Sequence, residues 1–191
     1  MLTRTRKILP ACLVAALAFG IGAAHADTLA GTWKAKQARF HYSGFTSQYT
    51  CDGLRSKVKT VLVALGARDD VKVEGSCGGR TFNEPQMSQS VVIGFAVAVP
   101  AEGRGSPGET FPVEWRVVQL RPKNPTSLAW GDCELVEQLR EQVLPLFNPR
   151  DVKDNTTCTP HQVNVGSPDL RVTVLMPVPA GPPANAVPPG N

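Results

Sequence analysis

The sequence lacks the short motifs on which many enzymes depend. It has no Gly-x-Ser-x-Gly elbow, no helical histidine pair with a glutamate, and no Cys-x-x-Cys. Only 3 of its 191 residues are histidine, so few side chains can exchange protons near neutral pH. We therefore expect a protein without enzymatic activity and without a cofactor.

The chain also has little excess charge and few aromatic residues. Its formal charge is +4, and aromatics make up 6%. Three of the basic residues, Arg4, Arg6 and Lys7, belong to an N-terminal segment without acids, and removing that segment lowers the charge to +1. No basic run interleaved with aromatics remains, so we expect no nucleic-acid partner.

The N-terminal segment is typical of an export signal. Its basic residues precede an apolar run over residues 8–23, and Ala24-His25-Ala26 fits the small-x-small cleavage pattern. The run is short for a membrane span of about 20 residues. We predict that residues 1–26 are a signal peptide, that the protein is periplasmic or secreted, and that it is not stably inserted in a membrane after cleavage.

Cleavage would leave four of the 5 cysteines. An even number in an oxidising compartment indicates two disulfides. A metal site built from His161, His41 and free thiols is the alternative, because Cys158 and His161 have a ligand-like spacing. The absence of any second spacing of this kind favours disulfides.

The region between the cysteines occurs twice. Placing Cys133 under Cys51 sets Arg150-Asp151 under Arg68-Asp69, and one deleted residue then aligns Cys158 with Cys77. We predict two copies of one β-α-β-β unit at residues 27–100 and 111–176. A Gly- and Pro-rich linker at 101–110 joins them, and a Pro-rich tail at 177–191 is predicted to be disordered.

Periodicity supports this unit. Alternation over 38–42 predicts a strand, and an apolar stripe over 52–65 predicts a helix that Gly66 ends. In the second copy, residues 113–118 alternate as a strand, and a helix is predicted from 132 to 147. The first helix is basic and the second acidic, which would let the two copies lie side by side or one molecule meet another, although solvated helix faces are the default.

The predicted fold class is α+β, with duplicated ferredoxin-like halves and an antiparallel-rich sheet carrying both helices on one face. A right-handed crossover brings each helix start near the end of the following strand. The favoured disulfides are therefore Cys51–Cys77 and Cys133–Cys158. On the chain-entropy model, closing each loop of about 25 residues contributes roughly 3–4 kcal/mol.

Polar residues on the strands form the predicted ligand face. Arg39, His41, Arg116 and Arg171 are expected to project away from the helices. Arginine presents a forked donor to carboxylate or phosphate, so the partner would be an unknown protein or an anionic small ligand. The alternative is a solvated face, with Arg116 paired to a neighbouring acid such as Glu114.

A carboxylate enzyme is the remaining alternative. Asp69, Asp70 and Asp151 lie in the predicted helix-to-strand turns, where aspartate is common for hydrogen bonding within the turn. We therefore interpret them as turn residues.

Three segments together resemble a family of small secreted bacterial proteins with an internal repeat, to which no activity is attached. They are Tyr-Thr-Cys-Asp-Gly-Leu at 49–54, Leu-Gly-Ala-Arg-Asp-Asp-Val at 65–71 and Cys-Glu-Leu at 133–135, and the resemblance spans about 35–175. It implies an exported protein and says nothing about mechanism.

Overall fold

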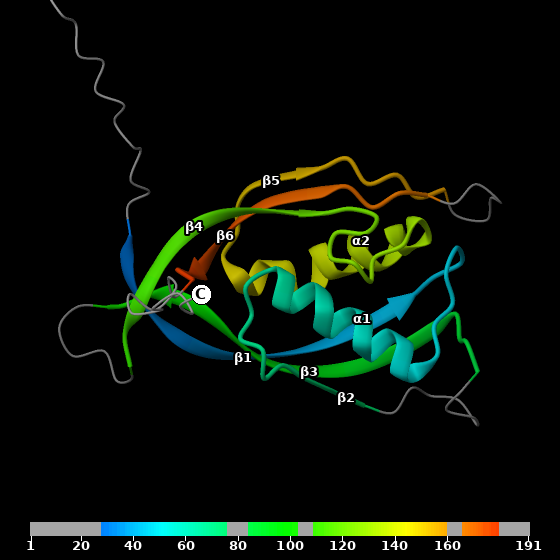
Figure 1. Cartoon of the computed structure of the whole chain (residues 1–191). Helices are drawn as coiled ribbons and strands as arrows, with labels where there is room; N and C mark the ends of the chain where they lie inside the picture. The colour runs from blue at the N-terminus through cyan, green and yellow to red at the C-terminus, as the bar shows by residue number, and fades with distance from the viewer. Residues whose placement is uncertain (1–27, 76–83, 103–108, 160–165, 180–191) are drawn as a thin grey trace, which may run out of the picture.

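The computed structural model describes residues 28–75, 84–102, 109–159 and 166–179 (Figure 1). The predicted signal peptide, Cys77, His161, most of the linker and the end of the tail lie outside these residues. The described chain forms strands and helices in the order β1 (Leu29–Ser43), α1 (Cys51–Ala64), β2 (Lys72–Glu74), β3 (Ser88–Pro100), β4 (Phe111–Leu120), η1 (Trp130–Asp132), α2 (Cys133–Gln142), η2 (Leu144–Phe147), β5 (Arg150–Asp154) and β6 (Leu170–Pro177).

The strands form one six-stranded sheet in the order β2-β3-β1-β4-β6-β5, and neighbouring strands are antiparallel. Both helices pack on one side of it. Leu54, Val58 and Leu62 of α1 and Leu135 and Leu139 of α2 share one core with apolar side chains from β1, β3, β4 and β6. The α+β class with an antiparallel sheet and two helices is confirmed.

The middle of the sheet is narrow. Strands β1 and β4 pair only between residues 29–31 and 111–113. Beyond that point β1 continues along β3 and β4 continues along β6. The sheet consequently spreads into two three-stranded wings, β2-β3-β1 and β4-β6-β5, and α2 lies between them (Figure 1).

Helix α2 completes the hydrogen bonding of the free edge of β1. The Gln138 amide accepts from the Ser43 N–H at 2.8 Å and donates to the Ser43 carbonyl at 2.7 Å. The Gln142 amide makes the same pair of bonds with His41, at 2.9 and 2.8 Å. These two side chains imitate the backbone amides of a neighbouring strand.

One turn further back, the Glu134 carboxylate accepts from the N–H groups of Phe45 and Thr46, both at 2.9 Å. The geometry matches because four helical residues rise about 6 Å, close to the roughly 6.7 Å of two strand residues. Residues 134, 138 and 142 of the helix therefore remain aligned with alternate residues along the chain of β1 and the turn that follows it.

The helix ends follow local sequence. The Thr50 hydroxyl accepts from the Gly53 N–H at 3.1 Å at the start of α1, and Gly66 has a φ of 93° just beyond its end. The predicted second helix over 132–147 is wrong in its last turn, because α2 ends at Gln142. Pro145 has no N–H and would clash with the preceding turn, so the chain continues as the 3-10 helix η2 until Asn148, whose φ of 48° ends it.

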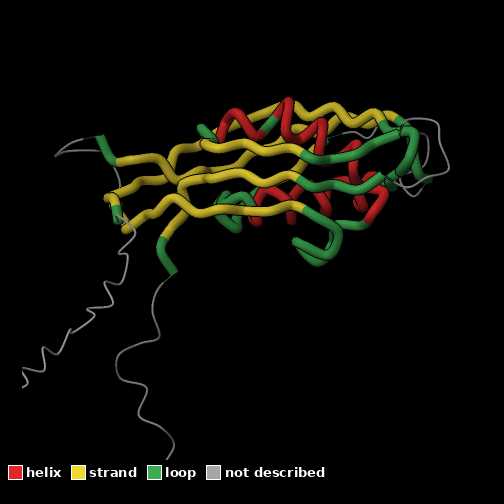
Figure 2. Tube along the Cα trace, turned by 90° about the horizontal axis from the view of Figure 1, so that it is seen from above, coloured by secondary structure: helices red, strands yellow, loops and turns green. Residues whose placement is uncertain are grey.

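The helices cover only one end of the strands, as the view from above shows (Figure 2). A second, small apolar cluster lies on the opposite face of the sheet, where β1, β3, β4 and β6 come together. Ala98, Val113 and Leu175 are buried there, and the rings of Trp33 and Phe111 approach to 4.9 Å. This cluster stabilises the junction between the wings.

The side-chain bonds along β1 predict a measurable contribution to stability. Replacing Gln138 by Met keeps the length of the side chain but removes two hydrogen bonds to Ser43, so the free energy of unfolding should fall by about 1–2 kcal/mol in urea denaturation. Lys59→Met on the exposed side of α1 is the control, since Lys and Met have similar helix propensities and the change should cost close to nothing. Equal losses in the two variants would contradict the role given to Gln138.

Candidate functional site

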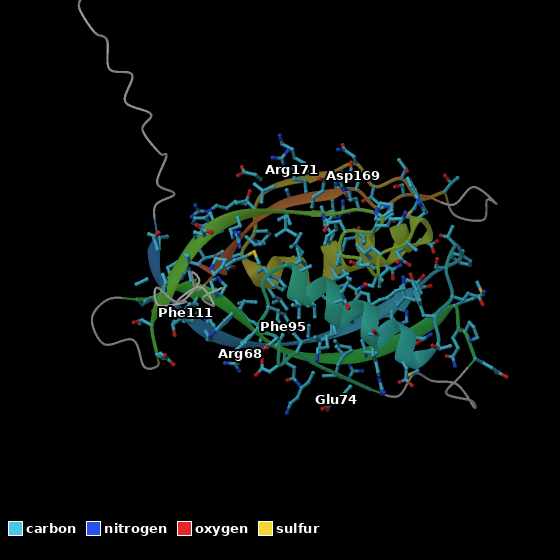
Figure 3. The ribbon with its side chains drawn as sticks, viewed as in Figure 1. Arg68, Glu74, Phe95, Phe111, Asp169 and Arg171 are labelled. Carbon is cyan, nitrogen blue, oxygen red and sulfur yellow. A yellow bond between two sulfur atoms is a disulfide. The ribbon has the colours of Figure 1, made fainter. Side chains whose placement is uncertain are left out.

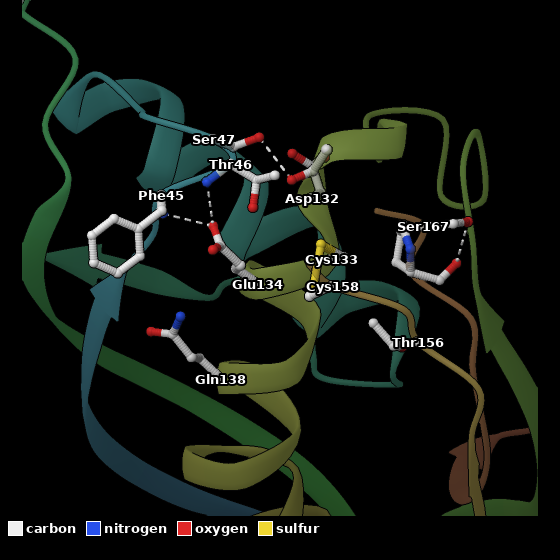
Figure 4. The surroundings of a disulfide bond; sticks show 12 residues. Phe45, Thr46, Ser47, Asp132, Cys133, Glu134, Gln138, Thr156, Cys158 and Ser167 are labelled. Atoms are coloured by element: carbon white, nitrogen blue, oxygen red, sulfur yellow. Dashed lines mark hydrogen bonds between the residues drawn. A yellow bond between two sulfur atoms is a disulfide. The ribbon is translucent and has the colours of Figure 1, made fainter. Parts of the chain in front are cut away.

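Two of the described cysteines lie at the N-terminal end of α2. Cys133 and Cys158 form a disulfide across 25 residues, the pairing predicted for the second copy (Figure 4). These two thiols are therefore not free to bind a metal. Cys51 is buried at the start of α1, and its predicted partner Cys77 lies outside the described residues. The Cys51–Cys77 pairing stays a prediction.

A buried polar cluster joins the two helices beside this disulfide. Asp132, only 2% exposed, accepts from the Tyr49 hydroxyl at 2.5 Å and from the Ala129 N–H at 2.7 Å. It also forms an ion pair with Lys57 of α1. The opposite charges of the two helices thus meet at one contact, and this arrangement satisfies both carboxylate oxygens.

Burial of this cluster shifts the pKa of its tyrosines. Desolvation, reinforced by the hydrogen bond to Asp132, raises the pKa of Tyr49 well above its usual value. Desolvation and the nearby Glu134 carboxylate raise the pKa of Tyr42. Both phenols are held in their neutral form, so they act as fixed hydrogen-bond donors and not as proton carriers at neutral pH.

Three of the four predicted ligand-face residues lie on the sheet surface that faces away from the helices. Arg39 and His41 are exposed on β1, where the His41 Nδ1 lies 2.9 Å from the Ser90 hydroxyl oxygen. Arg171 is exposed on β6, on the other wing. Figure 3 shows Arg171 on one side of the molecule and Glu74 of β2 on the opposite side. The structure therefore distributes these residues over two separate surfaces.

The predicted orientation of Arg116 is wrong. It lies directly opposite Val174 of the helix-side core, so its side chain is on the helix-bearing face. There it lines a hollow of about 280 Å³ with Ala64 and Met176, and its Nε lies 3.2 Å from a Glu114 carboxylate oxygen. The error arose because β4 carries apolar residues on both faces, and Val118 and Leu120, not Val113 and Trp115, point to the main core.

Two further cations share the outer surface of the β4-β6-β5 wing with Arg171. Lys153 of β5 lies directly opposite Arg171, and Arg150 lies opposite Thr173 two residues along β6. We call Arg150, Lys153 and Arg171 the cationic face. Lys153 and Arg150 could not be recognised from the sequence pattern, because only the strand register shows that they lie beside Arg171.

Each wing carries an arginine stacked over a tryptophan. The Arg150 guanidinium lies 3.7 Å from the centre of the Trp115 ring, and that of Arg68 lies 5.8 Å from the centre of the Trp33 ring. Both separations fall within the range of cation–π attraction. Arg68 and Arg150 are 82 residues apart, as are Trp33 and Trp115, and the same separation relates Cys51 to Cys133.

Comparison with known proteins gave no match to a family model, a curated protein sequence or a solved structure. In the described part of the chain, no helix is long and apolar enough to span a membrane. Nor does that part bring three or more His, Cys, Asp or Glu side chains together as a metal site. His161, named in the metal alternative, lies outside it.

The tyrosine cluster predicts alkaline sensitivity. Because the folded-state pKa of Tyr49 is raised, its stabilisation is complete below the ordinary pKa of 10.0 and declines as the pH rises above it, by at most about 1.4 kcal/mol per pH unit. Urea unfolding between about pH 8 and pH 11 should show this decline, and Tyr49→Phe should make it shallower. The same variant should be less stable at neutral pH by about 1–3 kcal/mol, because Asp132 loses a partner. An unchanged alkaline slope in Tyr49→Phe would contradict the assignment.

Proposed function

We propose that this protein is an exported, non-enzymatic binding protein that holds an anionic partner on its cationic face. The proposal is carried by the position of Lys153 and Arg171. They are directly opposite each other on adjacent antiparallel strands, and both are exposed. Like charges in that position destabilise a sheet by roughly 0.2–1 kcal/mol.

Among the described residues, no acid forms an ion pair with either of these two cations. By contrast, the exposed Arg68 and the half-buried Arg140 both have carboxylate partners. Asp169 is nearby in sequence, but its carboxylate accepts from the Gln119 amide at 2.9 Å. A face that keeps unpaired like charges at a cost in stability is suited to an anion supplied from outside.

A binding role fits the internal polar groups better than catalysis does. The best-formed cluster, Tyr49, Lys57 and Asp132, is buried and mutually bonded, so its groups are occupied in joining the helices. Asp151, one of the carboxylates considered for an enzyme, is exposed within β5, at the register irregularity between Arg150 and Lys153, and has a φ of 47°. Aspartate tolerates this left-handed conformation better than most residues do, so a structural role in the irregular strand accounts for it, and the predicted turn position is wrong.

We further propose that the chain arose by duplication of a β-α-β-β unit. Two observations support this: the element order repeats, and the sheet order β2-β3-β1-β4-β6-β5 is symmetric about its centre. Export is proposed from the N-terminal sequence, and the Cys133–Cys158 disulfide is compatible with an oxidising compartment.

Replacing Arg171 by Thr tests the binding role. The change removes the repulsion with Lys153, so the free energy of unfolding should rise by about 0.2–1 kcal/mol. Binding of poly-L-glutamate, measured by isothermal titration calorimetry at low salt, should weaken at the same time. A gain in stability with a loss of binding is typical of a functional surface that is not optimised for stability.

Arg39→Thr is the matched control for this experiment. Arg39 is also exposed on the outer surface of the sheet, but it lies opposite Val92 and so has no cation across the strand. The control should neither gain stability nor lose binding. Loss of binding in Arg39→Thr but not in Arg171→Thr would move the site to the other wing and contradict the proposal.

The proposed export predicts the mass of the mature protein. A denatured intact mass that begins at Asp27 and is four hydrogens below the fully reduced mass should be found after secretion, because the signal would be cleaved and two disulfides formed. A mass that includes residue 1, or one with all thiols reduced, would contradict export or the second disulfide respectively.

A further inference from the structure

We propose that Arg150 is the anchor of the cationic face, and that it binds a carboxylate of an extended acidic peptide in which alternate residues are acidic. This inference rests on the proposed binding function and identifies the partner. The two arginine–tryptophan stacks are at equivalent positions in the sequence, but, among the described residues, the guanidinium of one is paired with a carboxylate and that of the other is not.

The stack on the first wing already holds a carboxylate. Arg68 donates from Nε to one oxygen of Asp70 at 2.8 Å and from Nη2 to the other at 2.6 Å. This forked contact holds the pKa of the Asp70 carboxyl below its usual range. Bidentate pairing of this kind is the strongest arrangement that arginine makes with a carboxylate.

The stack on the second wing lacks a carboxylate in the equivalent position. Three residues, Asp69, Asp70 and Val71, separate Arg68 from Lys72, whereas only Asp151 and Val152 separate Arg150 from Lys153. The remaining aspartate, Asp151, forms no ion pair with Arg150. Within the described residues the Arg150 side chain contacts the Trp115 ring and has no carboxylate partner.

Trp115 restricts the side chain of Arg150, which has no carboxylate partner within the described residues. At 3.7 Å from the ring centre, the guanidinium is restricted by its contact with the ring, and Arg150 remains exposed to solvent. A restricted guanidinium loses less conformational entropy when it binds than a free side chain does. The Arg68–Asp70 contact shows which group such an arginine binds, namely a carboxylate that receives two parallel hydrogen bonds from the guanidinium.

The spacing of the other cations favours an extended peptide as the source of that carboxylate. Arg150 is opposite Thr173, while Lys153 is opposite Arg171, two residues away along β6. Two strand residues span about 6.6–6.8 Å, the same distance as between alternate side chains of an extended peptide. A peptide running along β6 could therefore place one acid at Arg150 and the next at Lys153 and Arg171.

The test uses the full mature protein and two synthetic peptides of equal composition, one alternating (Glu-Ser)₄ and one in blocks, Glu₄Ser₄. Calorimetry should show that the alternating peptide binds more tightly than the block peptide. Arg150→Ala should weaken its binding about ten- to a hundred-fold, the usual effect of losing a charge-assisted contact. Arg150→Lys keeps the charge but neither the planar stack on the ring nor the fork, so it should weaken binding, though by less than Arg150→Ala.

A gain-of-function variant gives an independent readout that misfolding cannot imitate. Asp70→Asn should free Arg68 on its tryptophan and add a second, weaker site for the alternating peptide. The second site should be weaker because Gly94, and not an arginine, lies opposite Lys72. Arg68→Ala removes an arginine that is already paired with a carboxylate, so this variant should bind the alternating peptide as tightly as the unsubstituted protein does.

Several results would overturn the inference. Binding that is unchanged in Arg150→Ala, equal affinity for the two peptides, or tighter binding of polygalacturonate than of the alternating peptide would each do so. If poly-L-glutamate binding depends on Arg171 but not on Arg150, the proposed function stands and the anchor is wrong. If no polyanion binds at all, both fail.

Discussion

The structure depends on how the free edge of β1 is satisfied after the sheet divides. Strand β4 leaves β1 after three paired residues, which would expose the N–H and carbonyl groups of His41 and Ser43. Gln138 and Gln142 of α2 bond to these groups in place of a strand. Unsatisfied backbone groups at a partly buried edge are costly, so this contact lets a helix lie between the wings and share one core with both.

The division of the sheet also determines where an anionic partner could bind. Because the helices fill the space between the wings, the outer surfaces of the two wings face different directions (Figure 3). On the first wing, Arg68 is neutralised by Asp70. On the second, Arg150, Lys153 and Arg171 have no such partner in the described chain. The two wings therefore resemble each other in framework and differ in electrostatics.

Part of this could be predicted from the sequence because it depends on local rules. The apolar stripe of α1, the left-handed residues at Gly66 and Asn148, and the exposure of Arg39 and Arg171 follow from periodicity and turn chemistry. The orientation of Arg116 could not be predicted, since β4 is apolar on both faces and an alternating pattern then fits either phase. The end of α2 was missed because the apolar stripe continues past Pro145 although the α-helix cannot.

The sequence by itself determined the repeated order of helices and strands and the spacing of Cys133 and Cys158. Only the tertiary structure decided that the sheet divides, that Asp132 is buried against Tyr49 and Lys57, and that Arg150 stacks on Trp115 beside Lys153 and Arg171. The reason is physical: helix and turn formation depend on neighbours a few residues away, whereas strand register and the contacts across it join residues far apart in the chain, and a shift of one residue moves every side chain to the other face.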